Sequence, residues 1–335
     1  MPKRKGSDHG LESVSSKTLR LSPATELTNT DYTVGWICAL PKEQTAAIAM
    51  LDQTHHPELP KQPNDHNAYT LGSIGAHNIV IACLPKGQYG TNSAAIAATQ
   101  MIASFPSVRV GLIVGIGGGL PSKVRLGDVV VSAPVDQYPG VVQWDMGKVG
   151  TDGFRRTGAL NSPPRALLTA LTKLETEHEM RGSMIRQYLD DVAERWPKLA
   201  PRYTSDSHLK DQMSDPDISR EIHVRYGLVA SGNQVVKDAE FRDGLDERLD
   251  GNVLCVEMEA AGLMNDFPCL VIRGICDYAD SKKNKDWQEY AAAVAAAYAK
   301  ELLGCVQHID INSERPMRDI LAKGQFLTGS FHLNI

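Results

Sequence analysis

The sequence has few aromatic residues and no cysteine motif typical of zinc binding or redox chemistry. Phe, Trp and Tyr make up 6% of the 335 residues, and none of the six cysteines belongs to a CxxC pair. Structural zinc sites and dithiol redox centres use such closely spaced ligands. We therefore predict neither a metal nor another cofactor. The cysteines are expected to be buried, reduced thiols of an intracellular protein.

The chain also lacks a long apolar run and an excess of basic charge. No apolar segment approaches the ~20 residues that span a bilayer, and the N-terminus has no signal-peptide core. The formal net charge is −5 at pH 7, which argues against nucleic-acid and membrane-surface partners. We expect a cytoplasmic protein that acts on a small molecule. The basic run PKRK at residues 2–5 leaves a nuclear location open.

Composition divides the chain into three parts. Residues 1–30 are polar and lack periodicity, which is typical of a disordered tail. Residues 31–308 form one predicted catalytic domain. Within it, a highly charged stretch at about 180–222 has little apolar rhythm and is expected to be a partly mobile surface insertion. Residues 309–335 are assigned to a C-terminal extension.

Short apolar runs alternate with helical patterns in the predicted domain. The runs are continuous rather than alternating, so both faces of the sheet should be covered by helices. The pattern predicts an α/β fold with three α/β/α layers around a mixed, largely parallel twisted sheet. Strands are predicted at 34–40, 79–84, 110–116, 128–133, 226–231, 252–256 and 269–276, and helices at 41–51, 92–105, 163–177 and 286–306.

A glycine-rich segment follows the predicted strand at 110–116. Four of the five residues from Gly115 to Gly119 are glycine, and such residues let a ligand approach the backbone closely. A dinucleotide-binding loop is disfavoured, because Pro121 and a further strand follow instead of a helix. The segment is therefore predicted to face a different kind of ligand.

Acidic residues follow three other strands. Glu43 lies in LPKEQ, Glu257 and Glu259 lie on either side of Met258 in VEMEAAG, and Asp277 lies in CDYAD. Each acid alone is also explained as a helix-terminus or loop residue. Ligands of parallel sheets bind beyond the carboxyl ends of the strands, so we expect these acids to meet at one edge of the sheet. A partly desolvated carboxyl group there has a raised pKa and can donate a proton.

These motifs together resemble the nucleoside phosphorylase/nucleosidase superfamily, which includes purine nucleoside phosphorylases and methylthioadenosine/adenosylhomocysteine nucleosidases. VEMEAAG, GIGGGL…LGDVVVS and CDYAD carry the resemblance, which extends from about Thr33 to Val306. VGWICALPKE, KGQYGTNSAA and ASGNQVVKD are similar to fungal proteins with a purine-phosphorylase-like domain. The resemblance implies a nucleoside phosphorylase-like fold, an enzyme of nucleoside metabolism such as purine salvage, and a homo-oligomer, with a dimer favoured.

The resemblance also implies roles for individual residues. Asp277 would protonate purine N7, Glu259 would bind the ribose hydroxyls, and Glu43 would orient and deprotonate the attacking water. No metal is required for this chemistry. Trp144 would stack on the base or, equally, pack in the core. The other implied substrate contacts are Met258, Glu257, Gly117, Gly118, Ser231, Gly232, Asn233 and Thr91.

The residues favour attack by water over attack by phosphate. Phosphate binding usually requires arginine and hydroxyl donors, yet the loops at 40–44 and 87–91 contain no arginine. We predict a purine nucleosidase that releases the free base from adenosine, guanosine or inosine through an oxocarbenium-like transition state. Lys42, Lys86 and Thr91 leave a phosphorylase open, and a non-catalytic nucleotide sensor is also possible. An ATP- or AMP-type nucleosidase is a further alternative, with a 5′-phosphate held by Lys86, Arg155, Arg156 and Arg273.

Overall fold

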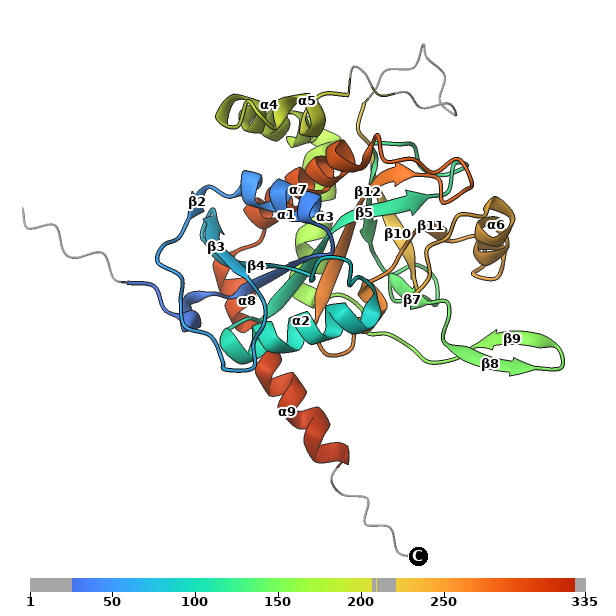
Figure 1. Cartoon of the computed structure of the whole chain (residues 1–335), viewed down its shortest axis with the longest axis horizontal. Coiled ribbons are helices and arrows are strands. Elements are labelled where there is room, and N and C mark those ends of the chain that lie inside the picture. Colours follow the sequence, from blue (N-terminus) through green and yellow to red (C-terminus); the bar gives the residue numbers. More distant parts are fainter. Residues whose placement is uncertain (1–25, 207–208, 210–220, 329–335) are drawn as a thin grey trace, which may run out of the picture.

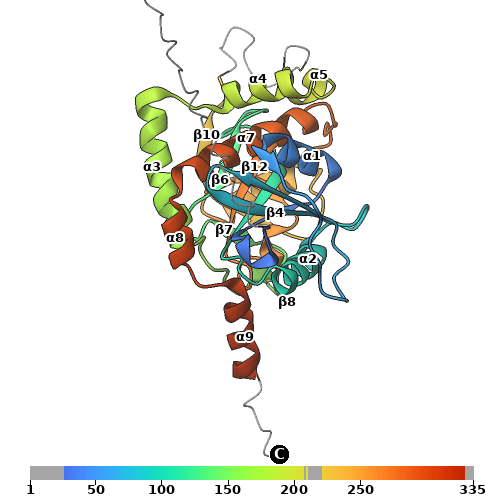
Figure 2. The ribbon, with the colours of Figure 1, turned by 90° about the vertical axis from the view of Figure 1, so that its left-hand side faces the viewer.

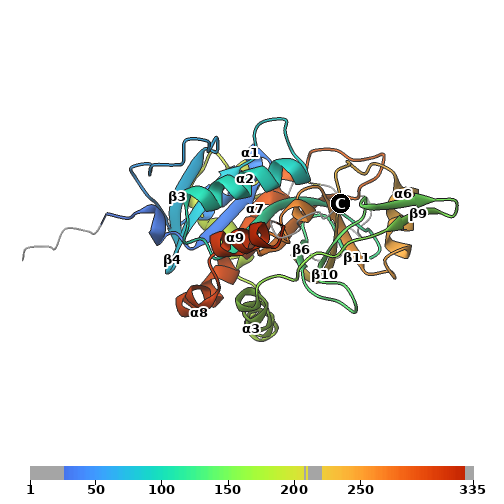
Figure 3. The same cartoon turned by 90° about the horizontal axis from the view of Figure 1, so that it is seen from below.

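The computed structural model describes residues 26–206, 209 and 221–328 (Figure 1). One ten-stranded sheet forms the centre, and a separate two-stranded hairpin projects from the body (Figures 1 and 3). Most of the predicted N-terminal tail, including the PKRK run, lies outside the described residues. Among the residues described, no helix is both long and apolar enough to cross a membrane.

The predicted strands and helices are present, with changes at their ends and with several additional elements. The sheet strands are β1 Val34–Cys38, β2 Gln53–Thr54, β3 Tyr69–Ile74, β4 His77–Cys83, β5 Val110–Gly119, β6 Val129–Ser132, β7 Val141–Gln143, β10 Val224–Ser231, β11 Val253–Glu257 and β12 Cys269–Asp277, and the hairpin consists of β8 Gly147–Gly150 and β9 Gly153–Arg156. The α-helices are α1 Pro41–Met50, α2 Thr91–Ser104, α3 Arg165–Arg181, α4 Ile185–Arg195, α5 Ala200–Tyr203, α6 Ala239–Glu247, α7 Gln288–Cys305, α8 His308–Ser313 and α9 Met317–Thr328.

The sheet is mixed and mostly parallel, as predicted. Its strand order is β11-β10-β6-β12-β5-β1-β4-β3-β2, and β7 pairs with β10. The central strand β1 lies parallel to both β4 and β5. An additional antiparallel pairing between β11 and β5 places Val256 opposite Gly118. This pairing closes β5, β12, β6, β10 and β11 into a ring.

The ring corrects the expectation that all the site-bearing strands end at one edge. Strand β12 is antiparallel to β6, and β6 is parallel to β10. Strands β10 and β11 therefore run in the opposite direction to β5 and β12. Strand β5 also continues through Gly119 instead of ending at residue 116. The glycines thus lie within a strand. The end of β11 reaches the site because β11 pairs antiparallel with this part of β5.

Helices cover both faces of the sheet, as the continuous apolar strands predict. Helices α1, α3, α4 and α7 share one hydrophobic core with one face, and α2 packs on the other face (Figures 1 and 3). Helix α7 is rich in alanine and lies very close to β12. A Cβ atom at Gly274 would lie only 1.9 Å from the carbonyl oxygen of Ala291. Small residues on both elements therefore permit this close packing.

The charged stretch near residue 180 contains more order than its sequence pattern indicates. Helices α4 and α5 lie across the layer formed by α1 and α7 (Figure 2). Ile185, Leu189 and Val192 of α4 are buried in the core shared with α7. The apolar stripe is only three residues long, and charged residues occupy the outer face, which explains why the pattern was missed. Residues 210–220 of the stretch lie outside the described residues.

Two further sequence expectations concern local structure. The six cysteines are free; four of them are buried as expected, whereas Cys83 and Cys305 are half-buried. The helix terminus considered for the acids of VEMEAAG is a single 3-10 turn, Ala260–Gly262. In the C-terminal region, α9 extends away from the body (Figure 2), while Met317 at its start is buried.

The buried stripe of α4 predicts the effect of two matched substitutions. Leu189→Ala removes a fully buried side chain and should lower the free energy of unfolding by about 2–5 kcal/mol. Asp191→Ala, on the exposed face of the same helix, should change it by less than about 0.5 kcal/mol. Urea unfolding of both variants measures the difference. Equal effects would show that α4 does not contribute to the core.

Candidate active site

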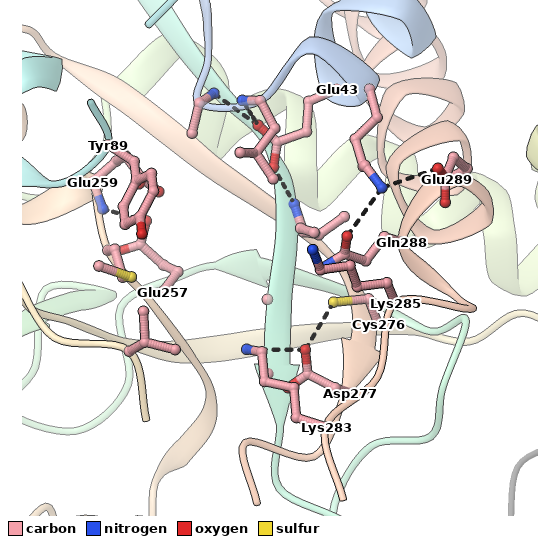
Figure 4. Close-up of a pocket in the computed structure, with 18 of the residues that line it drawn as sticks. Glu43, Tyr89, Glu257, Glu259, Cys276, Asp277, Lys283, Lys285, Gln288 and Glu289 are labelled. Carbon is pink, nitrogen blue, oxygen red and sulfur yellow. Dashed lines mark hydrogen bonds and ion pairs between the residues drawn. The ribbon is translucent and has the colours of Figure 1, made fainter. Parts of the chain in front are cut away.

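One cavity of about 650 Å³ contains the three acids that were predicted to carry the chemistry. Figure 4 shows Glu43, Glu259 and Asp277 arranged around it, each from a different part of the chain. The volume lies within the range of small-molecule sites. The structure thus brings these residues together, whereas their individual roles remain predictions. Four other predicted site residues also line the cavity, namely Gly117, Gly118, Glu257 and Met258.

Glu43 is held at the junction of β1, α1 and β5. One of its carboxylate oxygens accepts hydrogen bonds from the backbone N–H groups of Ala39 and Leu40, at 2.7 and 2.9 Å. The other accepts one from Ile116, at 2.9 Å. Burial raises the pKa of Glu43 above its ordinary value, although Arg273 and the three N–H groups oppose this effect. The side chain is therefore fixed in place and has an increased affinity for a proton, as a general base requires.

Arg273 is the buried cation of the site. Its guanidinium group donates to the carboxylates of Glu257 and Glu259, and only 1% of its side chain is exposed. The distance to Glu259 is 3.3 Å. Burial raises the pKa of Glu259 to about 7; Arg273 opposes the shift, and Glu257 adds to it. The guanidinium therefore balances two carboxylates that would otherwise be costly to bury together.

This position of Arg273 corrects its assignment as a 5′-phosphate ligand, since the side chain is buried, pairs with the two glutamates and does not line the cavity. The other three candidates for that role also lie elsewhere. Arg155 and Arg156 belong to the projecting hairpin, and Lys86 is exposed outside the cavity. The cations that do line the cavity are Lys42, Arg202, Lys237, Lys283 and Lys285. No spacing rule could have identified them, because they come from four separate segments.

Asp277 lies at the end of β12, apart from the three glutamates. Its Oδ1 accepts a hydrogen bond from the backbone N–H of Ala279 at 2.9 Å, and its Oδ2 lies 3.0 Å from the ammonium nitrogen of Lys283 (Figure 4). The thiol of Cys276 donates to the same Oδ2 at 3.1 Å. The contact with Lys283 places a positive charge beside this acid. Lys283 is a site residue that sequence reasoning missed, although it lies only six positions after Asp277.

The glycine segment of β5 is required by the charged side chains packed on it. A Cβ atom at Gly115 would lie 2.3 Å from a carboxylate oxygen of Glu43 and 2.7 Å from the guanidinium of Arg273. One at Gly118 would lie 3.0 Å from Asp277 Oδ1. Gly115 therefore makes room for the protein's own charges, whereas Gly117 and Gly118 line the cavity.

Five predicted substrate contacts lie outside the lining of the cavity. Ser231 accepts a hydrogen bond from the N–H of Ala261, and Gly232 packs against the indole of Trp144. Trp144 itself lines a second cavity. Its ring lies edge-on to that of Phe241, with 5.2 Å between the ring centroids. The remaining two, Thr91 and Asn233, are hydrogen-bonded to each other. Trp144 thus lies outside the main cavity, and its alternative role in packing fits this position better than stacking on the base.

The loop after β10 contacts the cavity a few residues further along than predicted. Gln234, Val235, Val236 and Lys237 line it in place of Ser231, Gly232 and Asn233, as does Tyr89 from another loop. The course of a loop depends on what it packs against, so its sequence alone did not identify the contacts. Within the described part of the chain, no cluster of three His, Cys, Asp or Glu residues is placed to hold a metal ion.

Known proteins similar to this chain share the predicted fold. The model of the phosphorylase superfamily matches residues 33–309. A nucleotide-binding leucine-rich repeat (NLR)-like protein of Hyaloscypha variabilis is 50% identical over 294 residues, which are 82% of this chain and 29% of that protein. This chain thus corresponds to less than a third of the length of that relative.

Other relatives are nucleosidases. The 5′-methylthioadenosine/S-adenosylhomocysteine nucleosidase of Mycobacterium tuberculosis is 26% identical over 81% of this chain and 95% of its own length. A death domain-containing ATP nucleosidase of Amphimedon queenslandica is 24% identical over 68% of this chain and 40% of its own. The structure of futalosine hydrolase from Helicobacter pylori superposes with a TM-score of 0.58, at 20% identity, over 83% of this chain and 99% of that one.

The raised pKa of Glu259 predicts how stability depends on pH. Its value of about 7 in the folded protein exceeds its ordinary value of 4.5. The contribution of Glu259 to the free energy of unfolding is therefore complete below pH 4.5 and is lost as the pH rises through 7. Between these values, the stability of the wild type should fall relative to Glu259→Gln. Urea unfolding at several pH values measures this difference, with Glu247→Gln on the exposed face of α6 as the control. A difference independent of pH would contradict the prediction.

Proposed function

Since this chain belongs to the phosphorylase superfamily, we propose that it is a nucleosidase that hydrolyses the N-glycosidic bond of a purine ribonucleoside. The observation that carries the proposal is the convergence of Glu43, Glu259 and Asp277 on one cavity. The acids separate into two groups. Glu43 and Glu259 lie around Arg273, and Asp277 lies with Lys283. Such an arrangement suits a reaction in which opposite charges develop on the two halves of the substrate.

In the proposed reaction, the bond between C1′ and N9 breaks and its electron pair remains on the purine. The proton of Asp277 moves to N7, and the resulting carboxylate is stabilised by Lys283. The ribose acquires positive charge, which the carboxylate of Glu259 stabilises from the hydroxyl side. Water attacks C1′ and gives its proton to Glu43. Preorganised charges of this kind lower the barrier because they stabilise the transition state more than the substrate.

The part of the cavity around Glu43, where the nucleophile would lie, favours water over phosphate as the attacking group. Glu43 is a buried carboxylate there and would repel a phosphate dianion. Arg273, the arginine that acts on Glu43, already donates to Glu257 and Glu259. A phosphate ion placed beside Glu43 would therefore meet a carboxylate, and Arg273 is already engaged by two glutamates.

A nucleotide nucleosidase is the second candidate. Five cations line the cavity, more than an uncharged nucleoside requires. One relative is described as an ATP nucleosidase, although this chain covers only 40% of its length. The bond that is cleaved would be the same, and the two candidates differ in the group carried at C5′ of the ribose.

The proposed role of Asp277 predicts a loss of activity in one variant and none in its neighbour. Asp277→Asn cannot donate the proton to N7 and should reduce kcat by about 10²–10⁴-fold, while the folded state is retained. Asp280→Asn, three residues later and outside the cavity lining, is the matched control. Chromatography of the free base released from adenosine, guanosine, inosine, AMP and ATP measures both.

Phosphate distinguishes the two reaction types in the same assay. A hydrolase should release free ribose or ribose 5-phosphates at the same rate with and without added phosphate. Release that requires phosphate, with ribose 1-phosphate as product, would reject the hydrolase. A wild-type rate in Asp277→Asn would reject the role of that acid.

A further inference from the structure

One end of the cavity is built by the α4–α5 segment, residues 182–206, which belongs to the stretch expected to be a surface insertion. Arg202 and Tyr203 of α5 both line the cavity. Lys42 and Thr45 of α1 and Glu289 of α7 line the same end. Figure 2 shows α5 beside these two helices. Three helices therefore form a wall whose chemistry differs from that of the acidic centre.

Helix α5 is anchored to both of its neighbours. Tyr203 is only 7% exposed and packs in the hydrophobic core that α1 and α7 share. Arg202 forms an ion pair with Glu289. Because Tyr203 is buried against α1, the backbone of α5 is fixed while the guanidinium of Arg202, 68% exposed, remains accessible to a ligand.

Two cations share a single carboxylate at this wall. The ammonium of Lys42 lies 2.9 Å from Glu289 Oε1, and Arg202 donates to the same oxygen. Lys42 also donates to the amide oxygen of Gln288 at 3.0 Å. Burial tends to raise the pKa of Glu289, but the hydrogen bonds from Lys42 and Arg202 outweigh it and hold the pKa below its ordinary value. Even with Glu289 fully ionised, the cluster has a net positive charge.

The proposed hydrolysis does not use this positive charge. Asp277 would act on the base, Glu259 on the ribose and Glu43 on the water, and an uncharged nucleoside would have no group for Lys42 and Arg202 to bind. A phosphate group at C5′ of the ribose would provide one. Arginine binds phosphate oxygens through two parallel hydrogen bonds, and lysine acts as a point charge beside it.

We propose that Arg202 and Lys42 bind the 5′-phosphate of a purine nucleotide, so that the α4–α5 segment selects nucleotides over nucleosides. This inference rests on the proposed function and specifies its substrate. On binding, phosphate oxygens replace Glu289 Oε1 as acceptors for both cations. Before binding, Glu289 acts as an internal counter-ion that holds the two side chains in position.

Steady-state kinetics with adenosine, AMP and ATP test the inference. The wild type should have a higher kcat/KM for AMP and ATP than for adenosine. Arg202→Ala should raise the KM for both nucleotides about tenfold or more, because a hydrogen bond to a charged group is lost. Its kcat, and its KM for adenosine, should stay unchanged. Arg202→Lys should restore part of the affinity, and Lys198→Ala, an exposed cation of the same segment, should have no effect.

Ionic strength provides an independent measurement. The KM for AMP and ATP should rise with added sodium chloride, because salt screens the attraction between phosphate and the exposed guanidinium. The KM for adenosine should not change. A merely structural role of α5 predicts equal effects of Arg202→Ala on all three substrates, and that result would overturn the inference.

The failure of this inference can be distinguished from failure of the proposed function. If the wild type hydrolyses adenosine but neither AMP nor ATP, the phosphate site is rejected and the nucleosidase stands. If no substrate releases a base, the nucleosidase is rejected. Calorimetric titration with inorganic pyrophosphate then shows whether Arg202 and Lys42 form an anion-binding site. Binding to the wild type that weakens about tenfold in Arg202→Ala supports the site. Equal affinity or no binding rejects it.

Discussion

The buried guanidinium of Arg273 is the interaction on which the candidate site depends. It lies between Glu257 and Glu259, and the three side chains are almost completely buried. Removing one partner of such a group leaves an uncompensated charge, at a cost of about 3–5 kcal/mol. The backbone is adapted to this cluster, because the glycine at position 115 leaves space for the guanidinium and for Glu43. The strand closure between β11 and β5 then carries the glutamates to the arginine.

This arrangement gives the cavity regions with different electrostatic properties. Around Arg273, burial raises the pKa of Glu43 above its ordinary value and that of Glu259 to about 7. At Asp277, the ammonium of Lys283 lies 3.0 Å from one carboxylate oxygen. In the third region, the two positive charges of Lys42 and Arg202 exceed the single negative charge of Glu289. Acid, base and anion recognition are thus separated within one cavity.

Sequence patterns identified the core of the site better than its periphery. The acids and glycines follow or occupy strands with strong apolar patterns, so their places near the sheet were predictable. Ser231 and Asn233 were expected to contact the base, yet the next four residues line the cavity instead. Arg202 gave no signal, because α5 is a single turn within a charged stretch. Such residues reach the site only through the packing of the segment that carries them.

The sequence by itself determined the elements of the α/β fold and the acidic residues of the site, because strand and helix formation depends on local periodicity and local backbone preferences. Only the tertiary structure decided which strand ends meet. Strands β10 and β11 run against β5 and β12, and their ends converge because the sheet closes into a ring. It also decided that Arg273 neutralises buried glutamates while Arg202 faces the cavity. Both choices result from contacts between residues far apart in the chain, which no local pattern encodes.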